Sequence, residues 1–156
     1  MKGKELIAPI LVIVLVGALV VYAIVNQIRE HHAQDDPMLI NIMEKLRPLF
    51  EGENYTGELE ELNHRRIFDE IRVYKGDKSY TINKEKVYIC MFDEDGDYYN
   101  ENMLVYVILH ELSHVICDEI GHTDKFHRIF DAVLERATAE GLYDPSIPVI
   151  RDYCQH

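Results

Sequence analysis

The most pronounced hydrophobic pattern lies at the start of the chain, where no charged residue occurs from 6 to 25. Twenty helical residues at about 1.5 Å each reach about 30 Å, the thickness of a bilayer's hydrocarbon core. A cleaved signal peptide has a shorter apolar region of about 7–15 residues, followed by small residues at the cleavage site. A small soluble domain could hardly bury a helix that is apolar on every face. We therefore expect residues 1–28 to form an uncleaved membrane anchor, with its transmembrane part at about 6–25.

Residues 29–37 are mostly polar and are expected to form a tether to a single domain at 38–156. Apolar residues then recur at helical spacing, which predicts a helix at about 38–50 with Asp36 as its N-cap. A second helix is expected to follow Asn100, to carry an apolar stretch at 103–109 and to end near Gly121. Thr123 is the predicted N-cap of a third helix at about 124–139.

Between the helices, from about 67 to 92, the pattern changes to short runs rich in β-branched and aromatic residues. Segments 71–74, 80–82 and 87–92 are separated by turn residues, which predicts two or three strands. The expected fold class is therefore α+β, with a small antiparallel sheet packed on two or three helices beside the N-terminal transmembrane helix.

The formal net charge is −12; residues 1–29 carry a small positive excess, so the remaining residues carry about −14. A domain this acidic repels phosphate backbones, so bulk nucleic-acid binding is not expected. Lys2 and Lys4 precede the apolar run, and the positive-inside tendency favours a cytoplasmic N-terminus with the domain across the membrane. On that side the tripeptide at 54–56 (NYT) would fit the N-glycosylation pattern. The three cysteines permit at most one internal disulfide, and only in an oxidising compartment.

The segment that indicates chemistry is HELSH at 110–114. Residues four apart lie on one face of a helix, so His110 and His114 can bind a single zinc ion. Glu111 would flank the ion and act as general base towards a water whose pKa the zinc lowers. Apart from Glu111, no charged residue occurs from 103 to 117. Buried polar groups need partners, so this arrangement favours a metal site over incidental histidines.

Catalytic zinc requires a third protein ligand, and a fourth position is left for water. His122 is our first choice, because Gly121 lets the chain turn back after the helix. Glu135 and Asp131 remain the main alternatives, and the other nearby candidates are Asp118, Asp124 and His127.

Cys117 shares the helical face of the two histidines, and a small core residue is its expected role. Cys117 or Cys154 could alternatively occupy the metal's open position and inhibit the site. Four tyrosines are possible donors to a developing oxyanion: Tyr98, Tyr99, Tyr143 and Tyr153.

The pattern around the motif, VILHELSHVI at 107–116 followed by GHTDKF at 121–126, resembles the WLM and SprT-like zinc peptidases. In that group a third histidine follows the motif, and a Phe or Trp comes a few residues later. The resemblance covers about residues 80–140. The resemblance implies zinc ligation by His110, His114 and His122, with Glu111 as general base. It also implies that the strand at 87–90 lies at the edge of the sheet, beside the substrate cleft. The spacing from His114 to His122 is longer than usual in WLM proteins.

The expected function is thus zinc-dependent hydrolysis of a polypeptide substrate close to a membrane. The alternative is a non-catalytic, membrane-tethered binding or structural module stabilised by the same zinc. The substrate, the membrane's identity and the oligomeric state do not follow from these patterns.

Overall fold

The computed structural model describes residues 4–34 and 36–154, which divide into two compact units at 1–33 and 34–156. The first unit is the helix α1, Lys4–Gln34. Within α1, Pro9–Ile28 is long and apolar enough to cross a membrane, and none of it is buried. Part of the expected tether, 29–34, continues the same helix, and residue 35 lies outside the described residues.

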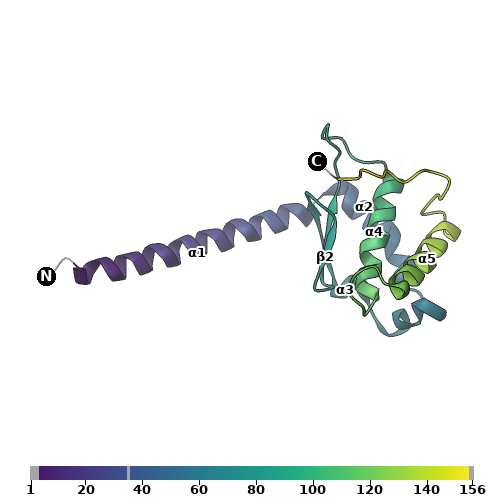
Figure 1. Cartoon of the computed structure of the whole chain (residues 1–156), viewed down its shortest axis with the longest axis horizontal. Helices are drawn as coiled ribbons and strands as arrows, with labels where there is room; N and C mark the ends of the chain where they lie inside the picture. The colour runs from purple at the N-terminus through teal and green to yellow at the C-terminus, as the bar shows by residue number, and fades with distance from the viewer. Residues whose placement is uncertain (1–3, 35, 155–156) are drawn as a thin grey trace. The chain divides into compact units, whose positions relative to one another are not determined.

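The second unit contains the remaining helices and one sheet (Figure 1). Its helical elements are α2 (Pro37–Phe50), the 3-10 helix η1 (Gly57–His64), α3 (Ile67–Glu70), α4 (Glu101–Ile116) and α5 (Asp124–Ala139). The predicted N-caps are confirmed, because the side chains of Asp36, Asn100 and Thr123 each accept a backbone N–H from the first turn of α2, α4 and α5. Local capping chemistry therefore sets where these three helices begin.

The sheet has three strands, β1 (Arg72–Gly76), β2 (Tyr80–Ile82) and β3 (Lys86–Cys90), in the order β1-β3-β2. β2 pairs with β3 in the antiparallel direction, but β1 pairs with β3 in the parallel direction. The expectation of an antiparallel sheet is therefore wrong for β1, and the α+β class is confirmed with a mixed sheet. The difference arises because β3 lies between β1 and β2, although these two strands are neighbours in sequence. The alternation of residues within a strand does not indicate the order of strands in a sheet.

α4 forms the centre of the domain, with the sheet on one side and α5 on the other (Figure 1). Leu104, Ile108 and Leu112 of α4 are fully buried, as are Val87 and Ile89 of β3. Val87 and Ile89 are two residues apart and so share one face of the strand. The helix that carries the HELSH segment is thus held in a rigid apolar layer.

One expected helix end needs correction, and two short helices are additional. α4 ends at Ile116, five residues before Gly121, and the Cys117 N–H bonds to the Ser113 carbonyl there. Gly121 instead lies within a loop at 117–123, where its φ of +85° is a conformation that glycine adopts without strain. The short helices η1 and α3 were not predicted, because fewer than three turns give little periodic signal.

Candidate metal centre

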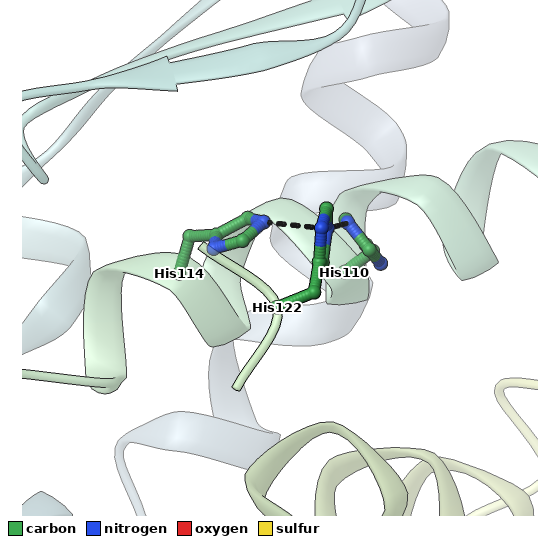
Figure 2. Close-up of side chains that lie close together, drawn as sticks. All are labelled: His110, His114 and His122. Carbon is green, nitrogen blue, oxygen red and sulfur yellow. Dashed lines mark hydrogen bonds between the residues drawn. The ribbon is translucent and has the colours of Figure 1, made fainter. Parts of the chain in front are cut away.

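Three imidazole rings converge at the C-terminal half of α4 and the loop that follows it (Figure 2). His110 and His114 project from one face of α4, as their spacing predicts. The loop at 117–123 then brings His122 back to the same place. The Nε2 atom of His122 is 2.9 Å from Nε2 of His110 and 3.2 Å from Nε2 of His114.

These separations fit a metal ion. Two nitrogens bound to tetrahedral zinc at about 2.0–2.1 Å lie about 3.3 Å apart, close to both observed distances. All three ligand atoms lie within 4.8 Å of one another. Among the described residues, no fourth histidine, cysteine or carboxylate belongs to this group. The three histidines are therefore close enough together to bind one metal ion.

The electrostatics of the site favour the neutral imidazoles that metal binding requires. Burial and, to a smaller extent, the neighbouring histidines together lower the pKa of His110 to about 4. Burial likewise lowers the pKa of His114 to about 4, with contributions from His122 and Lys84. Protons therefore compete little with a cation for these two rings near neutral pH.

A phenylalanine supports all three rings. Phe126, in the first turn of α5, is fully buried and stacks on His114 with ring centroids 4.1 Å apart. Its ring also meets His110 at 5.0 Å and His122 at 4.9 Å, both edge-on. Phe130, one turn further along α5, also packs edge-on against His110, with ring centroids 5.1 Å apart. These contacts limit the freedom of the imidazoles, so that the ligand positions are held in advance.

Glu111 lies beside the histidines and is almost completely buried, with 5% of its surface exposed. Its Oε2 accepts a 2.7 Å hydrogen bond from the hydroxyl of Thr81 on β2. Burial raises the pKa of Glu111, and the Thr81 hydrogen bond lowers it in part. The carboxylate is thus held in one orientation with a proton affinity above that of an exposed glutamate, which suits a base.

The group opens into a cleft of about 550 Å³. Its walls are Ser79 with the first two residues of β2, the β2–β3 turn at 83–84, the histidine-bearing face of α4 and the loop residues 119–122. Asn83 and Lys84 both have positive φ, and the Glu85 N–H bonds back to the Ile82 carbonyl, which closes a tight turn. The Lys84 ammonium donates to the Cys117 carbonyl, so the turn is fastened to the end of α4.

The resemblance placed the strand at 87–90 at the edge beside the cleft, and this is wrong. That strand, β3, is central, and the edge strand beside the cleft is β2, which contributes Tyr80 and Thr81 to the cleft wall next to Ser79. β2 was predicted as a strand but not as part of the site. Its role depends on strand order and could not be inferred from its three residues.

The alternative metal ligands lie elsewhere. Glu135 lines a separate depression beside Asn54, Tyr55 and Arg136. Asp118 forms an ion pair with Lys125. Among the residues that the structure covers, the group of possible ligands includes none of the remaining candidates, namely Asp124, His127 and Asp131.

Neither cysteine proposed as an inhibitory ligand belongs to the histidine group. Cys154 is joined to Cys90 in a disulfide. Cys117 is a buried free thiol, in agreement with the core role expected for it.

None of the four tyrosines suggested as oxyanion donors lines the cleft. Tyr98 donates to Asp36, and Tyr99 accepts from the Cys154 N–H. Tyr143 packs on Tyr106, and the Tyr153 hydroxyl forms a hydrogen bond with the Ser79 hydroxyl. The tyrosine that does line the cleft is Tyr80.

Sequence comparison relates the chain to viral proteins. It is 43% identical over 122 residues to uncharacterized protein 136R of Invertebrate iridescent virus 6, a match that covers 73% of this chain and 68% of the relative. It is 44% identical over 110 residues to uncharacterized protein 042R of Invertebrate iridescent virus 3, covering 68% and 69%. A shorter match, 41% over 54 residues, links it to uncharacterized protein R325 of Acanthamoeba polyphaga mimivirus, covering 33% of this chain and 27% of the relative. No protein-family model matches the chain, and no solved structure matches it significantly.

Proposed function

We propose that this chain, which belongs to the family of the iridescent-virus proteins 136R and 042R, is a membrane-anchored zinc metallopeptidase. The observation that carries the proposal is the convergence of three imidazole nitrogens beside a buried glutamate at an open cleft. Structural zinc sites are usually closed by four protein ligands, whereas catalytic sites have three and keep one position for water or substrate.

His110, His114 and His122 would hold the ion through their Nε2 atoms. A bound zinc ion supplies Lewis-acid polarisation of a carbonyl oxygen and lowers the pKa of a water molecule. Three neutral imidazoles suit zinc, since they leave the ion's full positive charge available for this purpose. The calcium and magnesium ions prefer oxygen ligands, so the donor set does not favour them.

Glu111 would act as the base that accepts a proton from the attacking water. The Thr81 hydroxyl occupies Oε2, so the second carboxylate oxygen, Oε1, is available for that proton. The raised pKa of Glu111 lets the same group hold the proton and pass it to the leaving amine. Glu111 is therefore assigned both the base and the acid role.

The edge strand β2 offers a way to orient an extended polypeptide. β2 pairs on one side with β3, and its residues Tyr80 and Thr81 line the same cleft as Glu111. An edge strand presents unpaired backbone N–H and C=O groups that a substrate chain can pair with. Such pairing would align a peptide bond with the histidine group without requiring a particular side chain.

The membrane part of the proposal depends on α1. Its Pro9–Ile28 stretch would cross the bilayer and keep the domain near the membrane surface, so that the substrates would be polypeptides located there. The excess of lysine before the apolar run favours a cytoplasmic N-terminus.

The decisive experiment compares Glu111→Gln with the wild type, each purified as the full chain in detergent and supplied with zinc. We expect the variant to keep one zinc per chain and to lose hydrolysis of labelled casein by at least about a hundredfold, since positioned acid–base groups contribute about 10²–10⁴. Glu119→Gln is the matched control, because Glu119 also lines the cleft but lies on the exposed loop.

If the wild type binds one zinc per chain but does not hydrolyse casein, the result would favour the non-catalytic module instead. Full activity in Glu111→Gln would show that another group is the base.

A further inference from the structure

We infer that the C-terminal unit resides in an oxidising compartment of the secretory pathway or beyond it, and that Asn54 is N-glycosylated there. This inference concerns the side of the membrane and a modification site. It requires that α1 directs the domain to a membrane, but it does not depend on zinc binding or catalysis.

The first observation is the disulfide between Cys90, the last residue of β3, and Cys154 in the C-terminal tail. Their Cα atoms are 6.3 Å apart, within the range of about 4.4–6.8 Å that a disulfide spans without backbone movement. The tail is also fixed by non-covalent contacts, because the Cys154 N–H donates to the Tyr99 hydroxyl and the Tyr153 ring packs on Tyr99. Structural disulfides of this kind persist in secreted and lumenal proteins and are rare where cellular thiols are kept reduced.

The second observation is the presentation of the tripeptide NYT, which is the single N-x-Ser/Thr pattern in the chain. Asn54 and Thr56 are exposed, while Tyr55 between them is 97% buried, with 3% of its surface exposed. The Tyr55 hydroxyl donates to the Leu49 carbonyl, and its backbone pairs with the Asn63 side chain. The middle residue thus anchors the turn and leaves the two recognition residues facing solvent.

The backbone around Asn54 is also suited to a surface attachment. Asn54 has φ of +65°, a left-handed conformation that asparagine tolerates better than most residues. The Thr56 side chain makes no capping hydrogen bond at the start of η1, so its hydroxyl is available. The folded domain therefore accommodates a glycan on Asn54 without breaking a hydrogen bond that Asn54 or Thr56 makes.

A glycan at this position would leave the cleft accessible. Asn54 and Thr56 line a shallow depression beside Glu135 and Arg136 of α5. That depression shares no residue with the cleft that contains the histidine group. The modification is therefore compatible with the proposed activity.

Delivery to the required compartment follows from α1 in either of its possible roles. A helix with an uncharged apolar stretch near the N-terminus targets the chain to the membrane, whether or not it is later cleaved. With Lys2 and Lys4 on the cytoplasmic side, the domain is translocated. The charge pattern before the apolar run and the disulfide are independent features that indicate the same side, and an exposed acceptor at Asn54 is available to be modified there.

The test is to express the full chain in cultured insect cells and to compare its electrophoretic mobility before and after treatment with peptide-N-glycosidase F. We expect one mobility shift in the wild type, its retention in Thr56→Ser, and its loss in Asn54→Gln and Thr56→Ala. Absence of a shift in the wild type, or a shift that survives Asn54→Gln, would overturn the assignment.

A second measurement addresses the compartment directly. Alkylation of the denatured, unreduced protein is expected to label Cys117 alone, and labelling of Cys90 and Cys154 is expected only after reduction. Labelling of all three cysteines without reduction would contradict an oxidising location. Both measurements are expected to give the same results in Glu111→Gln, so their outcome is separate from that of the peptidase assay.

Discussion

Thr81 provides the sharpest test of how the fold prepares Glu111. Its hydroxyl lies 2.7 Å from Glu111 Oε2 and is the one hydrogen-bond donor to that carboxylate within the described residues. Thr81 lies on β2 and Glu111 on α4, so this contact exists only because the sheet packs on the helix. Burial raises the pKa of Glu111 and the Thr81 hydrogen bond opposes that effect.

Thr81→Val keeps the shape of the side chain and removes the hydroxyl. A hydrogen bond to a charged group contributes about 1.5–3 kcal/mol, so its loss lowers the ratio of ionised to protonated Glu111 by about tenfold to a hundredfold. The base must be ionised to act, and therefore the acidic limb of the kcat/KM profile is expected to move to higher pH. On that limb kcat/KM is expected to fall by the same factor, with a smaller loss on the plateau.

The assay is peptide hydrolysis by the zinc-loaded full chain over the pH range in which it remains folded, with zinc content measured in parallel. Thr81→Ser is the matched control, because it retains the hydroxyl and is expected to keep the wild-type pH profile. An equal loss of activity at every pH, or an unmoved acidic limb, would refute the assigned role of Thr81.

Two further predictions concern the metal centre. His122→Ala is expected to reduce bound zinc from one per chain to nearly none after dialysis, because only two ligands remain. Glu135→Ala is expected to keep its zinc, and elemental analysis measures the zinc content of both variants. Zinc loss in Glu135→Ala alone would reverse the ligand assignment. The metal-free protein is expected to lose stability as pH falls from about 6.5 to about 4, since His110 and His114 titrate near 6.5 when unfolded and at about 4 when folded. In that pH range the unfolded chain binds more protons than the folded chain, so the free energy of unfolding falls. Urea unfolding in the presence of a chelator measures this fall. A free energy of unfolding that stays constant between these pH values would show that the two rings are not held neutral.

Much of the local structure could be predicted from sequence. The starts of α2, α4 and α5 follow from Asp36, Asn100 and Thr123, because an N-cap acts within three residues of itself. The juxtaposition of His110 and His114 follows from the helical repeat alone. Chain reversal after the helix favours His122 over Glu135, and the structure brings His122 next to His110 and His114, although the helix ends earlier than Gly121.

Other features of the site required the tertiary structure. Thr81 contacts Glu111, which is 30 residues away in sequence, and Phe126 contacts His114, which is 12 residues away. The roles of Thr81 and Phe126 therefore depend on how the helices and strands pack. The parallel pairing of β1 with β3 is equally non-local, because strand order is decided by which faces can be buried together.

The amino-acid sequence by itself determined the apolar N-terminal helix, the caps of three helices and the pair of histidines one turn apart, since each depends on interactions within a few residues. The tertiary structure alone decided which strand borders the cleft, which side chain holds Glu111 and which cysteines pair. These outcomes depend on contacts between distant segments, whose formation is governed by burial of the whole apolar core and not by any local pattern.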